Sequence, residues 1–417
     1  MSQARPVPSA VEGPVPSTVE TPVPSGVEGP SLTGISKSST RPTWAEISLP
    51  QLAENYKIVR EHVGPERAML AVVKADAYGH GIAEIATALA RLGVDWFGVT
   101  SADEGVELRQ LGITQPILLL TGFWEGEQSA LTDYDLVPAI YSEDQLATIE
   151  AWGRRTGKRI RFHLKVNTGM GMLGLHWQEV EHFLTIYRGM SHVEMEGLFE
   201  QFAASGDFVT PQANEQMNRF ESVEQALARA GIHPRYRHQA NSGAIVSRPR
   251  SWGNMVRPGL LLYGYHLPFR IPEGSQEPAF RSLPVREILS LKTKVIAVKE
   301  VPVGTPLGYG GRYVTPRHSR IATLPAGYAD GVNRRLSGKG RVIVRGQFAP
   351  IVANISMDLT LVDVTDVPNL SVGDEVILIG RQGDCRQTAL DMAQATGALP
   401  HEILCGIGKR VPRRYLR

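Results

Sequence analysis

The run from Lys74 to Gly81, Lys-Ala-Asp-Ala-Tyr-Gly-His-Gly, is the segment of the chain with the clearest chemical potential. The lysine directly follows an apolar stretch, so it would stand at the end of a buried strand. An amine in that position can hold an aldehyde cofactor covalently and can then act as a base toward a substrate. The spacing therefore predicts cofactor chemistry at Lys74. A surface lysine at a strand end is the alternative.

The elements around this lysine repeat a pattern of strand followed by helix. Eight short apolar runs are predicted to be strands, at 68–73, 96–99, 117–120, 136–140, 160–166, 193–199, 236–240 and 255–262. Helical patterns occur at 82–92, 102–111, 142–152, 177–187 and 214–230. Such alternation argues for a parallel sheet, and eight repeats fit a (β/α)₈ barrel of the TIM type. In such a barrel the chemistry sits at the carboxyl ends of the strands, where Lys74 would stand.

The rest of the chain differs in character from the barrel. Residues 1–41 carry an imperfect proline-rich repeat with too little apolar sequence to build a core, so we expect a disordered tail. Beyond about residue 280, short β-prone runs separated by glycine and proline predict a mostly β domain. We expect the tail at 1–41, the barrel at 42–280 and the β domain at 281–417. The strand predicted at 43–49 is expected to join the β domain.

The composition excludes several classes of protein. The 417 residues include 44 Lys and Arg and 42 Asp and Glu, a balance that indicates neither nucleic acid nor an anionic membrane as a partner. Cys385 and Cys405 stand in no metal-ligand spacing, so we expect no metal site and two reduced thiols in a cytoplasmic protein. No apolar run reaches the ~20 residues that a membrane span needs.

The segment around Lys74 resembles the cofactor-lysine motif of the alanine racemase family, which reads close to VKANAYGHG, with Asp76 replacing the usual Asn. The resemblance extends over nearly all of residues 43–417. It implies a barrel that binds pyridoxal 5'-phosphate, followed by a β domain, in agreement with the periodicity above. It also implies a homodimer in which each β domain completes the partner's active site.

The resemblance assigns the residues that would hold the cofactor. Lys74 would bind its aldehyde carbon. The run 238–242 resembles the HxANS segment, 256–264 resembles VRxGxxxYG, and 410–415 resembles the ending RVxRxY. The implied phosphate ligands are Tyr78, Ser242, Tyr415 and the backbone amides of Gly259 and Leu260.

Arg257 has a mechanistic consequence, because the resemblance places it against the pyridine nitrogen. A guanidinium stays protonated and only donates hydrogen bonds, so it disfavours a proton on that nitrogen. A carboxylate there would make the ring a stronger electron sink. The arginine therefore suits racemisation and suppresses side reactions such as transamination.

In the β domain the resemblance implies substrate-facing residues. The run 307–310 resembles the GYG segment, which makes Tyr309 the second catalytic base. Tyr309 would act on the L-enantiomer and Lys74 on the D-enantiomer. The run 325–331 resembles the GYADG loop and implies that Tyr328 lies near the substrate. The run 354–358 resembles GxxCMDQ, which assigns Met357 and Asp358 to substrate binding.

Two departures from the family pattern concern the site itself. The run 165–174 resembles KVDTGMxRLG, with Met172 where relatives place a carboxylate-binding arginine. In relatives the lysine at the Lys165 position is carbamylated and orients that arginine. Because Met172 is neutral, we expect Lys165 to remain an unmodified ammonium near the substrate. The run 197–203 resembles GxxTHFA, with Gln201 at the histidine position. Its amide oxygen is expected to accept a hydrogen bond from Arg257.

The sequence thus predicts an amino-acid racemase with alanine as the default substrate, which would supply D-alanine as a peptidoglycan precursor. A broad-specificity or serine racemase is the main alternative, favoured by Met172. A catalytically weakened homologue or a pyridoxal-phosphate-binding protein without catalysis is a second. A decarboxylase of the same fold is disfavoured by the tyrosine motifs.

Overall fold

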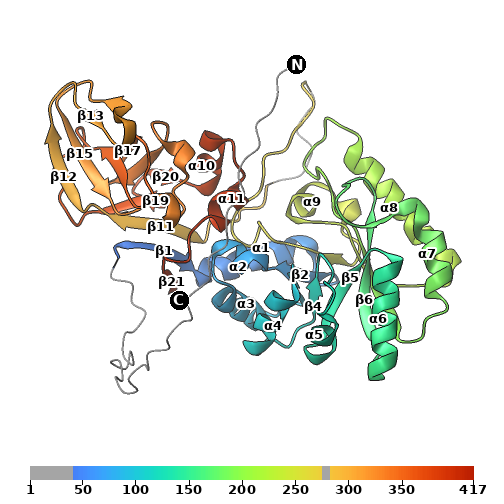
Figure 1. Ribbon diagram of the computed structural model, residues 1–417. Coiled ribbons are helices and arrows are strands. Elements are labelled where there is room, and N and C mark those ends of the chain that lie inside the picture. Colours follow the sequence, from blue (N-terminus) through green and yellow to red (C-terminus); the bar gives the residue numbers. More distant parts are fainter. Residues whose placement is uncertain (1–40, 275–281) are drawn as a thin grey trace, which may run out of the picture. The chain divides into compact units, whose positions relative to one another are not determined.

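The computed structural model describes residues 41–274 and 282–417. Within these ranges the predicted (β/α)₈ barrel followed by a mostly β domain is confirmed (Figure 1). The tail predicted at 1–41 lies outside the described residues except for Arg41. Arg41 pairs with the buried Asp330 at 2.9 Å and donates to the Pro325 carbonyl at 3.0 Å.

Eight parallel strands form the barrel sheet, in the order β10-β2-β3-β4-β5-β6-β8-β9. They are β2 (Ala68–Val72), β3 (Trp96–Val99), β4 (Ile117–Leu119), β5 (Leu136–Ile140), β6 (Ile160–Asn167), β8 (Val193–Phe199), β9 (Tyr236–His238) and β10 (Met255–Val256). The short β7 (Leu175–His176) adds to β6. The barrel closes after β9 and β10, where the Arg257 amide donates to the Ala240 carbonyl at 2.9 Å.

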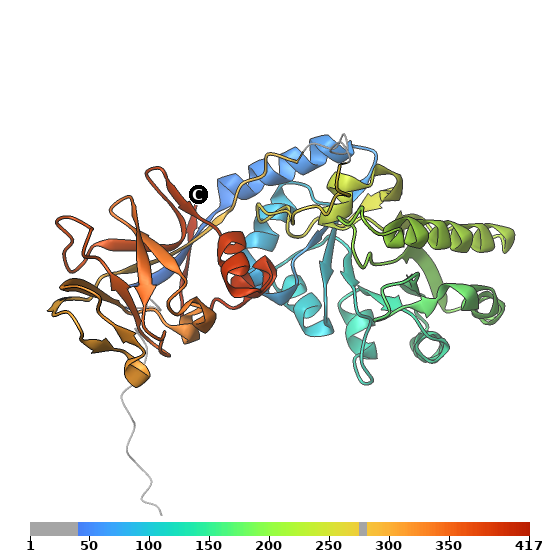
Figure 2. The same ribbon diagram turned by 90° about the horizontal axis from the view of Figure 1, so that it is seen from above.

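Helices surround the barrel strands, as Figure 2 shows from above with the cyan-to-green segments. They are α1 (Leu49–Val63), α3 (Ile82–Arg91), α4 (Ala102–Gln110), α5 (Gln128–Asp133), α6 (Glu143–Thr156), α7 (Val180–Tyr187), α8 (Gln212–Arg229) and α9 (Ser242–Ser247). Local signals set several boundaries. Ser142 caps α6 by accepting from the Gln145 amide, and Gly157 ends it in the left-handed conformation. Every residue of β5 is buried, as expected for a strand covered on both faces.

The eighth strand is shorter than predicted. The apolar run 255–262 suggested one continuous strand, but only Met255–Val256 pairs in the sheet. The chain then turns, with the Leu262 amide donating to the Gly259 carbonyl at 2.9 Å. Pro258 lacks an amide hydrogen for a ladder, and the apolar side chains that follow are buried in the turn. The apolar character of residues 255–262 therefore reflects burial and not a continuous strand.

The β domain is built on a second sheet, in the order β12-β15-β18-β17-β16-β19-β11-β1-β21, with β20 paired to β19. Its strands are β1 (Thr43–Ser48), β11 (Leu289–Lys294), β12 (Ala297–Val301), β15 (Ser319–Leu324), β16 (Arg341–Val344), β17 (Gln347–Val352), β18 (Thr360–Asp363), β19 (Glu375–Gln382), β20 (Cys385–Gln387) and β21 (Arg413–Leu416). A separate ribbon holds β13 (Pro306–Leu307) and β14 (Tyr313–Val314), and two helices, α10 (Ala389–Thr396) and α11 (Pro400–Cys405), follow β20.

The first strand of the described chain lies in this second sheet. β1 pairs antiparallel with β11 and parallel with β21. Both cysteines are free thiols. None of the helices in the described ranges is both long and apolar enough to cross a membrane.

Candidate active site

Lys74 begins α2 (Lys74–Gly79), a short turn that directly follows β2. The next four residues, 75–78, all have positive φ angles between 51° and 55°, so the segment winds left-handed. This conformation costs an L-residue ~1–2 kcal/mol. None of the four is glycine or asparagine, so the turn could not be predicted from the residue types. A strained backbone that presents two polar side chains is a mark of a functional site.

Two carboxylates, one from α4 and one from the turn itself, stabilise the left-handed turn through backbone amides. Glu104 accepts from the Ala75 amide at 2.7 Å, and Asp76 accepts from the Ile82 amide at 2.7 Å. Ile82 is the first residue of α3, where a negative charge is favourable. The replacement of the family's Asn by Asp at position 76 is therefore compatible with the local structure.

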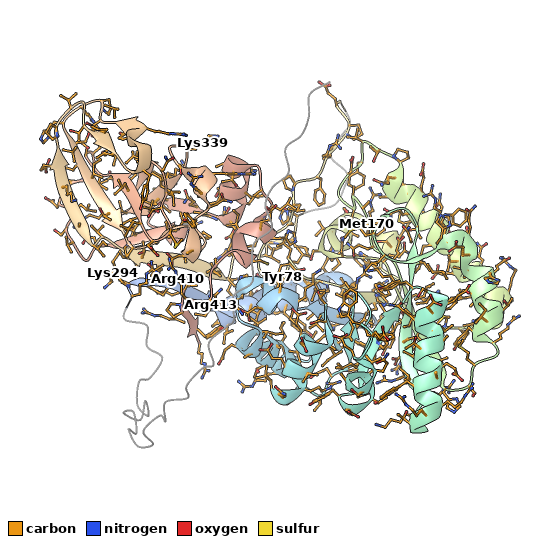
Figure 3. All side chains as sticks on the ribbon, viewed as in Figure 1. Tyr78, Met170, Lys294, Lys339, Arg410 and Arg413 are labelled. Atoms are coloured by element: carbon orange, nitrogen blue, oxygen red, sulfur yellow. The ribbon has the colours of Figure 1, made fainter. Side chains whose placement is uncertain are left out.

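Strand β21 contacts the same turn. Arg413 donates to the Gly79 carbonyl from two nitrogens, at 3.1 and 3.0 Å, and Figure 3 labels it together with Tyr78. The Tyr415 hydroxyl donates to the His80 carbonyl at 3.0 Å. Tyr415 was expected to bind a phosphate. In this chain its hydroxyl contacts the backbone of the turn that carries Tyr78.

The Tyr78 side chain reaches from the turn to the segment after β10. A Cβ atom at Gly259 would lie 2.7 Å from the Tyr78 hydroxyl, so glycine is needed there. Ser242 accepts from the Gly259 amide at 2.9 Å and from the Leu261 amide at 3.3 Å. The Tyr78 hydroxyl and the Leu260 amide have no hydrogen-bond partner among the described residues. Four of the expected phosphate ligands are thus brought together.

Arg257 is buried at the end of the short β10, with 3% of its surface exposed. One terminal nitrogen donates to Nδ1 and to the carbonyl of His238, at 2.9 and 2.8 Å. The other donates to the carbonyls of Glu200 and Gln239 and to Oε1 of Gln201. The expected acceptor role of Gln201 therefore matches the geometry. The Nε–H of Arg257 has no acceptor among the residues that the structure describes.

Two buried histidines extend the Arg257 contacts into the barrel. Because His238 accepts from Arg257 through Nδ1, its proton is assigned to Nε2, which lies 2.9 Å from Nδ1 of His163. Burial lowers the pKa of His163 to about 3 and the pKa of His238 well below its usual value, with the charge of Arg257 contributing to both. Both rings are therefore neutral, and the charge of the network resides on Arg257. Neither histidine was predicted from the sequence to have a role in the site.

Glu200 is a second residue that the sequence reasoning did not single out. It is fully buried, Thr168 donates to one of its carboxyl oxygens, and the other oxygen has no partner among the described residues. Burial raises the pKa of Glu200 to about 8, and the charge of Arg257 opposes that rise. The sequence feature that could have identified Glu200 is a charged residue directly after the apolar strand 193–199, at the position where the family motif has threonine.

Lys165 lies at the end of β6 and donates to the Leu120 carbonyl at 3.1 Å. Burial and, to a smaller extent, the charges of Arg257 and Lys74 together lower the pKa of Lys165 to about 8. These three cations therefore share one region. Met172 does not join them, because its side chain is 74% exposed in the loop after β6. Figure 3 labels Met170 in the same loop.

The predicted residues of the β domain form a separate group. The Tyr328 amide donates to the Ser356 carbonyl at 3.0 Å, and the Ala329 amide donates to the Met357 carbonyl at 3.1 Å. Asp358 pairs with Arg410 at 2.8 Å. Tyr309 is 77% exposed, and Asn354 donates to its carbonyl at 3.0 Å. No hydrogen bond or ring contact within the described ranges links this group to Lys74.

Comparisons with known proteins agree with this geometry. Residues 47–267 match the family described as alanine racemase, N-terminal domain, and residues 288–415 match alanine racemase, C-terminal domain. The alanine racemase of Halothermothrix orenii is 39% identical over 381 residues, which covers 91% of this chain and 98% of that protein. The alanine racemase of Geobacter sulfurreducens is 38% identical over 382 residues, covering 90% of this chain and 98% of that protein.

Solved structures give the same result. The alanine racemase of Clostridium difficile 630 superposes with a TM-score of 0.82 at 32% identity, over 90% of this chain and 96% of that one. The alanine racemase of Bartonella henselae, solved with covalently bound pyridoxal phosphate, superposes with a TM-score of 0.79 at 30% identity, over 90% of this chain and 99% of that one.

Proposed function

The chain belongs to the alanine racemase family, and from this premise we propose that it interconverts L- and D-alanine with pyridoxal 5'-phosphate as its cofactor. One observation carries the proposal. The strained turn 75–78 presents Lys74 and Tyr78 together, and the Tyr78 hydroxyl lies against Gly259, two residues after Arg257.

The unsatisfied groups of this site fit the proposed cofactor. A phosphate would accept from the Tyr78 hydroxyl and the Leu260 amide, next to Ser242 at the start of α9. A pyridine nitrogen is an acceptor and would suit the free Nε–H of Arg257. Lys74 supplies the amine that an aldehyde requires. When bound, the cofactor would withdraw electrons from the substrate and acidify its Cα–H.

The chain's own residues would then move the proton. Lys74 Nζ removes or returns a proton on one face of the substrate Cα, and the Tyr309 hydroxyl does so on the other face. Arg257 would donate to the ring nitrogen and so disfavour a proton on it, because a guanidinium cannot accept a hydrogen bond from a protonated ring nitrogen. Lys165 provides a positive charge for the substrate carboxylate. Tyr328, Met357 and Asp358 belong to the loops that border the substrate.

We further infer that the active form is a homodimer. Tyr309, Tyr328 and Met357 are 77%, 44% and 52% exposed, an unusual degree of exposure for side chains of this kind on neighbouring loops. Two bases are needed on opposite faces of one carbon, yet among the described residues no hydrogen bond or ring contact joins Tyr309 to Lys74 of its own chain. A partner chain that supplies Tyr309 meets both requirements.

The proposal is tested by α-proton exchange in deuterated water, followed by chiral analysis, on a panel of amino acids that includes alanine and serine. Both enantiomers of alanine should exchange Cα–H and interconvert, and Lys74→Ala should abolish both processes. Exchange without interconversion would indicate a weakened homologue. Faster interconversion of serine than of alanine would reassign the substrate.

A further inference from the structure

A polar cavity of about 520 Å³ lies away from the proposed active site. It forms where α1 begins and where β11, β19 and β20 meet, and its volume is within the usual range for small-molecule sites. Three arginines from separate positions line it, namely Arg286, Arg381 and Arg386, and Glu287 is the only carboxylate in its lining. The cavity therefore carries a net positive charge.

The position of two of these arginines is unfavourable for folding. Arg381 and Arg386 stand directly opposite each other in the antiparallel pairing of β19 with β20. Side chains in such a cross-strand pair project from the same face, and like charges there are destabilising. Glu287 pairs with Arg386. The side chains of Arg381 and Arg286 have no ion pair or hydrogen bond within the described part of the chain.

The backbone at the third arginine is firmly held. Asn55 of α1 is fully buried, accepts from the Arg286 amide at 3.0 Å and donates to the Arg286 carbonyl at 2.8 Å. A Cβ atom at Gly264 would lie 1.9 Å from the same carbonyl, so the turn after β10 packs tightly against it. The backbone of Arg286 is therefore fixed, which lowers the entropic cost of ordering its side chain around a ligand.

We propose that this cavity is a binding site for a small phosphate-bearing polyanion, held between the guanidinium groups of Arg286 and Arg381. Guanidinium groups match phosphate through paired hydrogen bonds, and Arg386 would share the anion with Glu287. The Ser290 hydroxyl in the lining can donate to a further oxygen. The ligand needs at least two negative charges, because two guanidinium groups are uncompensated. This site is independent of the proposed racemase activity.

The test is isothermal titration of the cofactor-saturated enzyme with inorganic pyrophosphate at constant ionic strength, so that the proposed cofactor-phosphate site is already filled. Wild type should bind one pyrophosphate per chain. Arg381→Gln and Arg286→Gln should each weaken binding by about tenfold or more, because each removes a charge-assisted contact. Arg91→Gln is the matched control, since Arg91 is an exposed arginine at the end of α3 and far outside the cavity lining.

Thermal melting gives a second readout. Without ligand, Arg381→Gln should melt at a higher temperature than wild type, because the repulsion with Arg386 is relieved. With saturating pyrophosphate the wild type should gain stability and the variant should not. Non-saturable binding by wild type would overturn the proposal. Unchanged affinity in both Arg381→Gln and Arg286→Gln would also overturn it.

Discussion

Oε1 of Gln201 accepts a hydrogen bond from a terminal nitrogen of Arg257 at 3.3 Å. That nitrogen also donates to two backbone carbonyls, so the amide of Gln201 is one of three acceptors. Glutamine here is neutral and cannot titrate, unlike the histidine that relatives carry at this position. The charge state of the contact is therefore fixed across the working pH range.

Replacing Gln201 by leucine should lower kcat/KM by about two- to tenfold, the usual worth of one hydrogen bond. The absorbance of the bound cofactor should shift as well, because Arg257 would lose one of its restraints. Gln201→His should retain most of the activity. If Gln201→Leu matched wild type in both activity and absorbance, the contact would have no functional role.

The covalent attachment site is predicted to be Lys74. Borohydride reduction of the enzyme followed by peptide mapping should find the pyridoxyl group on the peptide that contains residues 74–81. Lys74→Ala should show no covalent label, whereas Lys165→Ala should still be labelled. Label on Lys165 in the wild type would overturn the assignment, since both amines lie in the same cationic region.

The exposed Tyr309 predicts that active sites are shared between two chains. Lys74→Ala and Tyr309→Phe should each be inactive alone, and mixed dimers should recover activity. A mixed dimer holds one intact site and one doubly defective site. With full exchange of subunits, about a quarter of wild-type turnover is expected from simple symmetry, since half the dimers carry one intact site of two. No recovery despite demonstrated exchange would contradict a shared site.

Glu200 should make stability depend on pH. Its pKa is raised from 4.5 to about 8 in the folded chain by burial, so the folded state binds more protons than the unfolded state between these values. The free energy of unfolding should therefore fall as pH rises from about 4.5 to 8, and level off above. Glu200→Gln should remove this fall. Glu221→Gln, at an exposed site on α8, should retain it, and equal slopes for wild type and Glu200→Gln in denaturant titrations would refute the account.

Lys165 and Met172 predict a pH-dependent affinity for substrate. With its pKa lowered to about 8, Lys165 is an ammonium at neutral pH and loses its charge above pH 8. KM should therefore rise above about pH 8 in the wild type. Arginine is longer than the exposed Met172 and keeps its charge above pH 8, so a guanidinium that reaches the site from this loop should make KM rise less. A high-resolution density map should show Lys165 without a carbamate, and identical KM profiles would exclude a role for position 172.

Much of the fold was predictable because barrel strands are short, apolar and regularly spaced. The runs at 96–99 and 136–140 are buried strands at their predicted positions. The turn 75–78 was not predictable, since its conformation is imposed by contacts with Glu104 and with β21. Contacts between residues this far apart in the sequence cannot be predicted from the local sequence of the turn.

Residues of the site could be predicted where they belong to a motif of several consecutive matching residues. Tyr78, Ser242 and Gly259 meet as expected. The burial of Glu200 could not be predicted, because a glutamate at a strand end is usually a surface residue and its burial depends on the three-dimensional packing. The phosphate contact expected of Tyr415 stays a prediction, and its hydrogen bond to the His80 carbonyl is one that the motif did not indicate.

The pairing of β1 with β11 and β21 has a consequence for synthesis on the ribosome. β1 emerges first, yet both of its neighbours in the sheet emerge only after the whole barrel has been translated. The barrel is in effect an insertion between the first two strands of the β domain. Until β11 appears, the apolar side chains of Trp44 and Ile47, which are buried in the finished sheet, have no native strand partner. If the barrel folds during synthesis, β1 is therefore an unpaired apolar strand throughout that time, which favours aggregation.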